Sequence, residues 1–142
     1  MKFTLISDSD KDEVVVYASE ENELVKAIRE LCERENEPII AYDEKEIYKL
    51  SPFEVICFVS DGDRLYAHTE RGRLRVKSRL SRIEEGLPSS FVRINQSCIA
   101  NLSMIERFDA SFAGTLGVVF KNGYRDYVSR RNLKKVKERV GL

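Results

Sequence analysis

Three polar side chains, Asn95, Gln96 and Ser97, separate the apolar, strand-like residues FVRI from the apolar residues CIA. Amide side chains can pair with an adenine edge through two hydrogen bonds, and a hydroxyl can contact a base edge or a phosphate. On a loop that leaves a strand, these groups would reach a DNA groove without a recognition helix. The structural alternative is that Ser97 caps a short helical turn while Asn95 stabilises the bend. The residues are compatible with both roles.

A second candidate site is the basic segment VSRRNLKKVKER near the C-terminus. If Ser129 caps a helix there, Arg130 and Arg131 occupy its first turn, where the helix dipole disfavours each cation by about 0.3 to 1 kcal/mol. Natural sequences tend to break such local rules at functional sites. With Lys134 and Lys135 behind them, the arginines would bind phosphate, and arginine can also contact a guanine edge. The pattern favours a nucleic-acid contact.

A third basic cluster, RGRLRVKSRLSR, has the alternation of a strand. The alternation places Leu74 and Val76 on one face and Arg73, Arg75 and Lys77 on the other. These cations could contact phosphate. Equally, they could belong to an ordinary exposed face, or to an edge strand that cations protect against unwanted pairing.

The charge is divided between the two halves of the chain. Residues 1–70 hold 8 basic and 18 acidic side chains, a net charge of −10, whereas residues 71–142 hold 16 and 6, a net charge of +10. Such asymmetry suggests an anionic partner for the second half, with nucleic acid the usual candidate. The alternative is that the two halves attract each other within the fold.

Catalytic, metal and cofactor sites are not indicated. His68 is the single histidine, and the spacings GxGxxG, GxxxxGKS/T and HExxH do not occur. We therefore expect no enzyme activity, metal or cofactor. Cys32, Cys57 and Cys98 are widely spaced among apolar neighbours, which predicts buried free thiols. Such thiols, an N-terminus that turns acidic too early for a signal peptide, and the lack of a long apolar run predict a cytoplasmic protein.

From residue 38 onward the pattern predicts a mostly β structure with two short helices. The helices are expected over 78–86 and 129–140, and Asn122-Gly123 predicts a tight hairpin turn because it tolerates positive φ angles. The expected strands are 38–42, 46–50, 55–59, 64–69, 73–77, 91–94, 116–120 and 124–128.

The N-terminal segment is expected to form a small strand-strand-helix unit. Strands are predicted over 3–6 and 14–18, followed by a helix that Ser19 caps and that ends near Asn36, before Pro38. The predicted domains are therefore an acidic unit, 1–37, for dimerisation or regulation, and a second domain, 38–142.

Two of these motifs resemble a known family, the LytTR-type DNA-binding domain of bacterial response regulators. The family pattern combines an F-x-R-x stretch that ends in S-x-(apolar)-V-N-L with an N-G hairpin followed by S-R-R-x-(apolar)-K. The resemblance covers roughly residues 38–140. The matching residues are Phe91, Arg93, Asn95, Gln96, Ser97, Asn101, Leu102, Asn122, Gly123, Val128, Ser129, Arg130 and Arg131.

The resemblance implies consecutive small β-sheets whose loops enter successive major grooves on one side of a bent duplex. It implies contacts from the turn 62–64, the loop 95–97 and the start of the last helix, with Asn101 holding its own loop instead of contacting bases. Asn95 and Gln96 depart from the commoner family residues, and Asp63 adds an acidic group. The expected DNA-binding residues are Asp63, Arg64, Asn95, Gln96, Ser97, Arg130, Arg131, Lys134 and Lys135.

The function that the resemblance implies is a sequence-specific regulator of transcription that binds direct-repeat sites on double-stranded DNA as a homodimer or paired monomers. Residues 1–37 are too short for a phospho-acceptor receiver domain, so the chain is similar to small receiver-less members, often controlled by a companion membrane protein. Two other interpretations stay open. One is a protein-interaction or ligand-sensing module, and the other is a single-stranded RNA binder, which the lack of a clear row of exposed aromatics disfavours.

Overall fold

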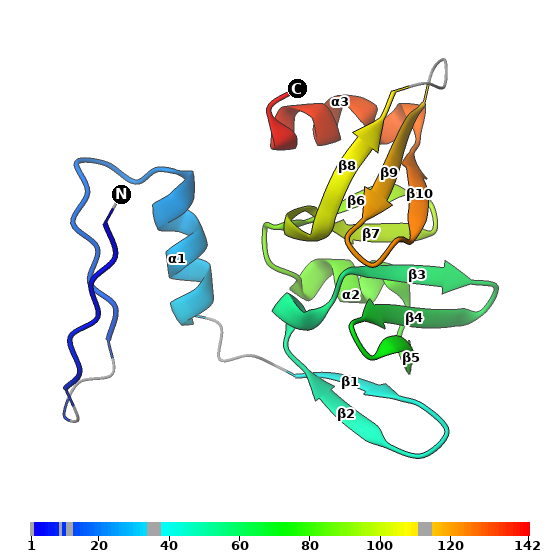
Figure 1. The fold of residues 1–142 in the computed structure, drawn as a ribbon, viewed down its shortest axis with the longest axis horizontal. Helices are drawn as coiled ribbons and strands as arrows, with labels where there is room; N and C mark the ends of the chain where they lie inside the picture. Colours follow the sequence, from blue (N-terminus) through cyan, green and yellow to red (C-terminus); the bar gives the residue numbers. More distant parts are fainter. Residues whose placement is uncertain (1, 9, 11–12, 34–37, 111–114) are drawn as a thin grey trace. The chain divides into compact units, whose positions relative to one another are not determined.

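The structure is a computed structural model that describes residues 2–8, 10, 13–33, 38–110 and 115–142 (Figure 1). The chain divides into two compact units, Met1–Glu35 and Asn36–Leu142. The predicted domain boundary at residue 37 and the predicted helix end at Asn36 lie outside the described residues. None of the described helices is long and apolar enough to cross a membrane.

In the first unit the predicted helix is present, but the two predicted strands are not. Helix α1 spans Glu23–Glu33, and the side chain of Asn22, not Ser19, accepts the backbone N–H of Val25 at 3.0 Å. The residues predicted as strands, 3–6 and 14–18, are not hydrogen-bonded strands. Two isolated strands are only marginally stable without a face to bury, and apolar side chains here, such as Tyr17, are exposed.

The second unit is built on a seven-stranded antiparallel sheet with the strand order β2-β1-β5-β4-β3-β7-β6. Consecutive strands joined by tight turns account for most of the pairing, as expected for short alternating segments with turn residues between them. The strands are β1 (Ile39–Tyr42), β2 (Ile47–Leu50), β3 (Cys57–Asp61), β4 (Arg64–Thr69), β5 (Gly72–Val76), β6 (Phe91–Asn95) and β7 (Cys98–Asn101).

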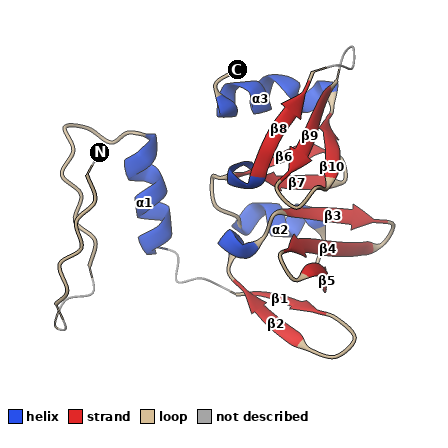
Figure 2. Ribbon diagram, viewed as in Figure 1, coloured by secondary structure: helices blue, strands red, loops and turns tan. Residues whose placement is uncertain are grey.

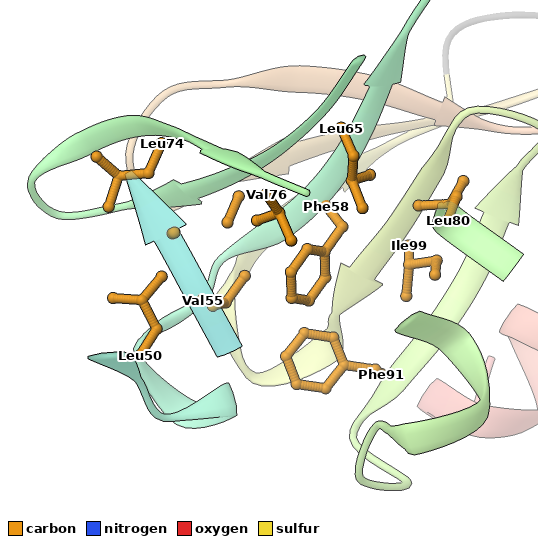
Figure 3. Close-up of a cluster of buried hydrophobic side chains, with 11 residues drawn as sticks. Leu50, Val55, Phe58, Leu65, Leu74, Val76, Leu80, Phe91 and Ile99 are labelled. Carbon is orange, nitrogen blue, oxygen red and sulfur yellow. The ribbon is translucent and has the colours of Figure 1, made fainter. Parts of the chain in front are cut away.

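One face of this sheet packs against helix α2 (Leu80–Gly86), as Figure 3 shows. Phe58 and Phe91 lie at the centre of this core, with their ring centroids 5.9 Å apart. The alternation predicted for β5 is correct, since Leu74 and Val76 point into this core. A 3₁₀ turn, Pro52–Glu54, connects β2 to the entry of β3.

The opposite face is covered only in part. A three-stranded sheet, β8 (Ile105–Asp109), β9 (Leu116–Phe120) and β10 (Arg125–Val128), and helix α3 (Arg130–Val140) form a second core (Figure 2). In this core Ile94 and Cys98 of the large sheet meet Phe120, Val128 and Val136. A second 3₁₀ turn, Leu102–Met104, leads from β7 into β8.

The predicted mostly β fold is confirmed, with two strands missed. All eight strands and both helices predicted after residue 37 are present, β4 and β9 with the predicted bounds and the others with shifted ends. The Asn122-Gly123 turn joins β9 to β10 with φ +88° at Gly123. β7 and β8 were not predicted. Cys57 and Cys98 are buried free thiols as expected, but the prediction for Cys32 is wrong, because it is exposed on α1.

Candidate nucleic-acid interface

Two tight turns of the large sheet lie side by side. Gly62-Asp63 joins β3 to β4, with φ +64° at Gly62, and Gln96-Ser97 joins β6 to β7. The backbone N–H of Ser60 donates to the carbonyl oxygen of Ser97 at 2.8 Å, so both turns lie at the same end of the sheet. Asp63, Arg64, Gln96 and Ser97 are exposed there. This arrangement brings two of the expected contact regions together.

The start of α3 lies beside the second turn. The backbone N–H of Ser129, which precedes α3, donates to the carbonyl oxygen of Ile94 at 2.8 Å. The Ser129 hydroxyl does not cap a backbone N–H of the helix, and instead accepts from Asn132 Nδ2 at 2.8 Å. Arg130 and Arg131 are both exposed in the first turn. The positive end of the helix and the side chains of Arg130 and Arg131 therefore face solvent at this point.

Lys134 and Lys135 continue the basic surface along α3, and both are exposed. Val136 is fully buried beside them and anchors the opposite side of the helix in the second core. Lys135 also lines a cleft of about 180 Å³ with Arg93 and Arg139. The two lysines thus sit on adjacent parts of the helix surface, but only Lys135 is turned toward β6.

Asn95 differs from its neighbours because it is buried, with only 3% of its surface exposed. Its amide nitrogen donates to Asp126 Oδ1 at 2.7 Å and to the carbonyl oxygen of Tyr127 at 2.8 Å. Its amide oxygen accepts the backbone N–H of Ser97 at 2.8 Å. Burial and these bonds count against a base contact by Asn95 and favour the alternative in which it stabilises the bend. Ser97 itself lies in a hairpin turn, so the suggestion that it caps a helical turn is wrong.

Arg93 fixes the same turn from the other side. Its guanidinium donates to the carbonyl oxygens of Asn95 at 3.2 Å and Gln96 at 2.7 Å, and it forms an ion pair with Glu84 of α2 at 3.2 Å. Charge-assisted bonds to backbone carbonyls are stronger than neutral ones, so they hold the turn in one conformation. Gln96 therefore projects from a backbone that is rigid on both sides.

The carboxylate of Asp126 completes this network. It accepts the Asn95 amide, the hydroxyl of Tyr124 at 2.8 Å and the backbone N–H of Tyr127 at 2.8 Å. Burial, together with the bond to Asp126, raises the pKa of Tyr124 well above its usual value. Tyr124 therefore stays a neutral donor, and β10 is held against the end of β6.

Sequence reasoning assigned no site role to Arg93 or Asp126. Arg93 had a signal, since it belongs to the F-x-R-x stretch of the family pattern. Asp126 lies 31 residues from Asn95 and nothing in the local sequence marks it. Asn101 behaves as expected, because it is buried, donates to the carbonyl oxygen of Val55 at 3.0 Å and caps the 3₁₀ turn that follows it.

Beside the turn 62–64 of the large sheet, arginine side chains shift the pKa of a neighbouring tyrosine. The Arg64 guanidinium hydrogen-bonds the Tyr66 hydroxyl, and with Arg73 it lowers the pKa of Tyr66 below its usual value. The same contact raises the pKa of Arg64. Both directions are those expected when a phenol lies beside fixed positive charge. The turn 62–64 therefore holds cations and carboxylates together, since Arg73 also pairs with Asp61 at 3.2 Å and Asp63 adds to the raised pKa of Arg64.

The structure thus brings together two turns at one end of the large sheet and the basic start of α3. The chain also matches a known family over this region. The family model described as the LytTr DNA-binding domain matches residues 45–141. The chain belongs to the LytTR family. In the described parts of this LytTR chain, no group of three or more His, Cys, Asp or Glu side chains could hold a metal ion.

Curated relatives of the LytTR chain match over most of their length. A protein from Staphylococcus aureus strain NCTC 8325, named an HTH-type transcriptional regulator, is 28% identical over 148 residues, covering 100% of this chain and 99% of the relative. A protein of the same name from strain MSSA476 is 30% identical over 119 residues, covering 84% of this chain and 80% of the relative. The match to the first of these relatives therefore includes the N-terminal unit.

A solved structure shows the same fold. The LytTr DNA-binding domain of a methyl-accepting/DNA response regulator from Bacillus cereus superposes with a TM-score of 0.70 at 20% identity, covering 75% of this chain and 100% of that domain. The LytTR fold described above is therefore shared at low sequence identity. In the second unit of this chain, strands β6 to β10 lie between helices α2 and α3, so these two helices do not form a helix-turn-helix pair.

Proposed function

We propose that this LytTR protein is a sequence-specific regulator of transcription that binds double-stranded DNA. The observation on which the proposal rests is the adjacency of three expected contact regions, held together by the bonds from Ser60 to Ser97 and from Ser129 to Ile94. Loops at one end of a sheet can enter a major groove. The start of a helix beside them can enter the next groove or contact its phosphates.

Within this proposal the exposed side chains have different roles. Gln96 and Arg131 are the best candidates for base contacts, because a carboxamide and a guanidinium can each form two bonds with one base. Arg64, Ser97, Arg130 and the two lysines of α3 would contact phosphates, which give affinity without sequence information. Asn95 would hold the turn in position through its hydrogen bond to the Ser97 backbone. The carboxylate of Asp63 would have to point away from the DNA phosphates.

A homodimer or paired monomers on direct-repeat half-sites remain part of the proposal, as do a cytoplasmic location and control by a companion membrane protein. The first unit supports an assembly role, because Phe3, Ile6 and Tyr17 are 87%, 83% and 95% exposed. Apolar surface of this kind often marks an interaction site. Deleting residues 1–37 should therefore change the oligomeric state or the DNA affinity, and no change in either would remove this role.

Selection from randomised duplex DNA, with sequencing at two salt concentrations, tests the main proposal. We expect enrichment of a spaced direct repeat and weaker binding at the higher salt concentration, since phosphate contacts release counterions. A lack of enrichment at both salt concentrations would contradict sequence-specific binding.

The alternative function, a ligand-sensing or protein-interaction module, has one observation in its favour. A cavity of about 620 Å³ lies between the β1–β2 hairpin and α2, lined by residues that include Ile39, Tyr42, Lys77 and Ile83. Its volume is within the range of small-molecule sites. Retention of duplex selectivity when this cavity is filled by an Ile39→Phe substitution would favour the DNA-binding proposal.

A further inference from the structure

The large sheet has a second surface whose composition suggests a ligand. Within the second unit, the residues of the second core do not extend over β1, β5 and the start of β4 on the face of the large sheet that carries this core. Cross-strand pairing places Tyr42 opposite Arg75, and Arg75 opposite Tyr66, in one row. Arg73 and Lys77 lie two residues to either side on β5 and share its face. We call these five residues the tyrosine–cation face.

The cations of this face are held over the tyrosine rings. The Arg73 guanidinium carbon lies 3.6 Å from the ring centroid of Tyr66. The Arg75 guanidinium carbon and the Lys77 nitrogen lie 5.8 Å and 5.3 Å from the centroid of Tyr42. Cations over ring faces at these distances are attracted by the ring quadrupole. Long side chains that would otherwise move freely are therefore restrained on the sheet.

The two explanations considered from the sequence do not account for this surface. Protection of an edge strand is excluded, because β5 lies between β1 and β4 in the interior of the sheet. On an ordinary exposed face the long cationic side chains would extend into solvent, whereas those of this face lie over tyrosine rings. Among the described residues, Arg73 pairs with Asp61 at 3.2 Å, whereas neither Arg75 nor Lys77 has a carboxylate within 4.0 Å. Two restrained cations are left for an anionic partner.

The same surface is continuous with the proposed DNA interface. Val76 pairs with Leu65, so Lys77, the next residue, lies near the start of β4, where Arg64 follows the turn 62–63. A positive strip therefore runs from the turn end of the sheet along β5, through Lys77 and Arg75 to Arg73. The strip lies outside the second core, and no strand or helix of the described second unit is packed over it in that core.

We propose that the tyrosine–cation face binds the phosphate backbone of duplex DNA beyond the grooves contacted by the turns, lengthening the footprint without adding sequence preference. This inference rests on the proposed function. A sheet face that stacks unpaired bases needs free aromatic faces. Here the rings of Tyr42 and Tyr66 have cations over them, while the guanidinium and ammonium N–H groups remain available for phosphate oxygens.

The experiment compares the full chain with the double variant Arg75→Gln/Lys77→Gln on a long duplex that extends well beyond the selected site. We expect weaker binding to specific and random duplexes by the same factor, with their ratio unchanged. The slope of log affinity against log salt should become shallower by about 1.8, or about 0.9 for each lost phosphate contact. On a duplex trimmed to the selected site, the double variant should bind like the wild type.

A matched control removes the same charge elsewhere. Arg107 is exposed on β8 of the three-stranded sheet, so Arg107→Gln should leave the slope on the long duplex unchanged, whereas Arg75→Gln alone should make it shallower by about 0.9. Tyr42→Leu is a second variant that keeps all charges but removes the ring beneath Arg75 and Lys77. It should weaken long-duplex binding, and the thermal unfolding of every variant is compared with that of the wild type.

The outcomes separate the two proposals. If the wild type selects a site and Arg75→Gln/Lys77→Gln keeps the wild-type slope on the long duplex, the tyrosine–cation face is not a DNA surface, although the proposed function stands. Preference of the wild type for single-stranded DNA, lost in Tyr42→Leu, would assign the face to base stacking and overturn the duplex inference. If the wild type does not bind duplex DNA at all, the proposed function and this inference both fail.

Discussion

The proposed DNA interface has a base and a rim that differ in burial and bonding. We define the base as Arg93, Asn95 and Asp126, whose polar groups bond to one another's backbone or side chains and connect β6 to α2 and β10. The rim consists of the exposed side chains Gln96, Ser97, Arg130, Arg131 and Lys134. Two neighbouring residues therefore differ: Asn95 belongs to the base and Gln96 belongs to the rim.

If the proposed interface binds DNA, this difference would explain how a small β domain presents side chains to a groove without a recognition helix. A side chain that contacts a base must keep its position within a fraction of an ångström, and exposed turns are usually mobile. Here the backbone around Gln96 is bonded from both sides, by Arg93 and by Asn95. In the proposed interface, the polar residues of the base would therefore hold the turn in place, and those of the rim would contact DNA.

The largest effect is expected at the base, for Asn95→Ala. The substitution leaves the Ser97 N–H, the Tyr127 carbonyl oxygen and one Asp126 oxygen with fewer partners. Unpaired groups of this kind should lower the free energy of unfolding by about 2 to 4 kcal/mol, measured by urea denaturation. DNA binding should fall as well, because the turn loses its support.

Gln96→Ala is the matched control for Asn95→Ala, one residue away on the rim. Because Gln96 is exposed, its truncation should change the free energy of unfolding by less than about 0.5 kcal/mol while specific binding is still lost. Equal destabilisation by the two alanine variants would abolish the distinction between base and rim.

Arg131→Ala should have the next largest effect, on binding alone. A lost two-bond base contact should weaken binding to the selected site by about 1 to 3 kcal/mol, with a smaller loss on random duplex. Both affinities can be measured by fluorescence anisotropy at one salt concentration. The control is Arg107→Ala on β8, which removes the same charge away from the interface.

Equal losses on selected and random duplex would show that Arg131 contacts phosphate only. That result would move it from a base-contact role to the phosphate-contact role given to Arg130, and would leave Gln96 as the main candidate for specificity.

Much of this arrangement could be predicted from the sequence, for physical reasons that differ by element. The alternating pattern of β5 predicted its buried and exposed faces because one face packs against α2 and the other is open to solvent. β7 was missed because all four of its residues, CIAN, are buried, so there is no alternation to detect. A bulge between Ile105 and Arg107 similarly breaks the period of β8.

The sequence carries a signal only for the exposed side chains of the candidate site. Residue type and the family pattern indicated Gln96, Arg130 and Arg131, which the structure places on the surface. The role of Asn95 depends on Asp126, which lies on another sheet and comes close only after both cores have formed. Likewise, the row formed by Tyr42, Arg75 and Tyr66 depends on the pairing of three strands, and no short segment of sequence shows it.

The smallest effect is expected for Lys134→Ala, at the outer part of the rim. Lys134 is exposed on α3 and has a compact, strongly hydrated charge, which suits a phosphate better than a base edge. Its loss should weaken selected and random duplexes by the same factor. The slope of log affinity against log salt should become shallower by about 0.9, while Arg107→Ala on β8 should leave it unchanged. A change in selectivity would instead place Lys134 beside Arg131 among the base contacts, and the region of α3 that contacts bases would then extend by one helical turn.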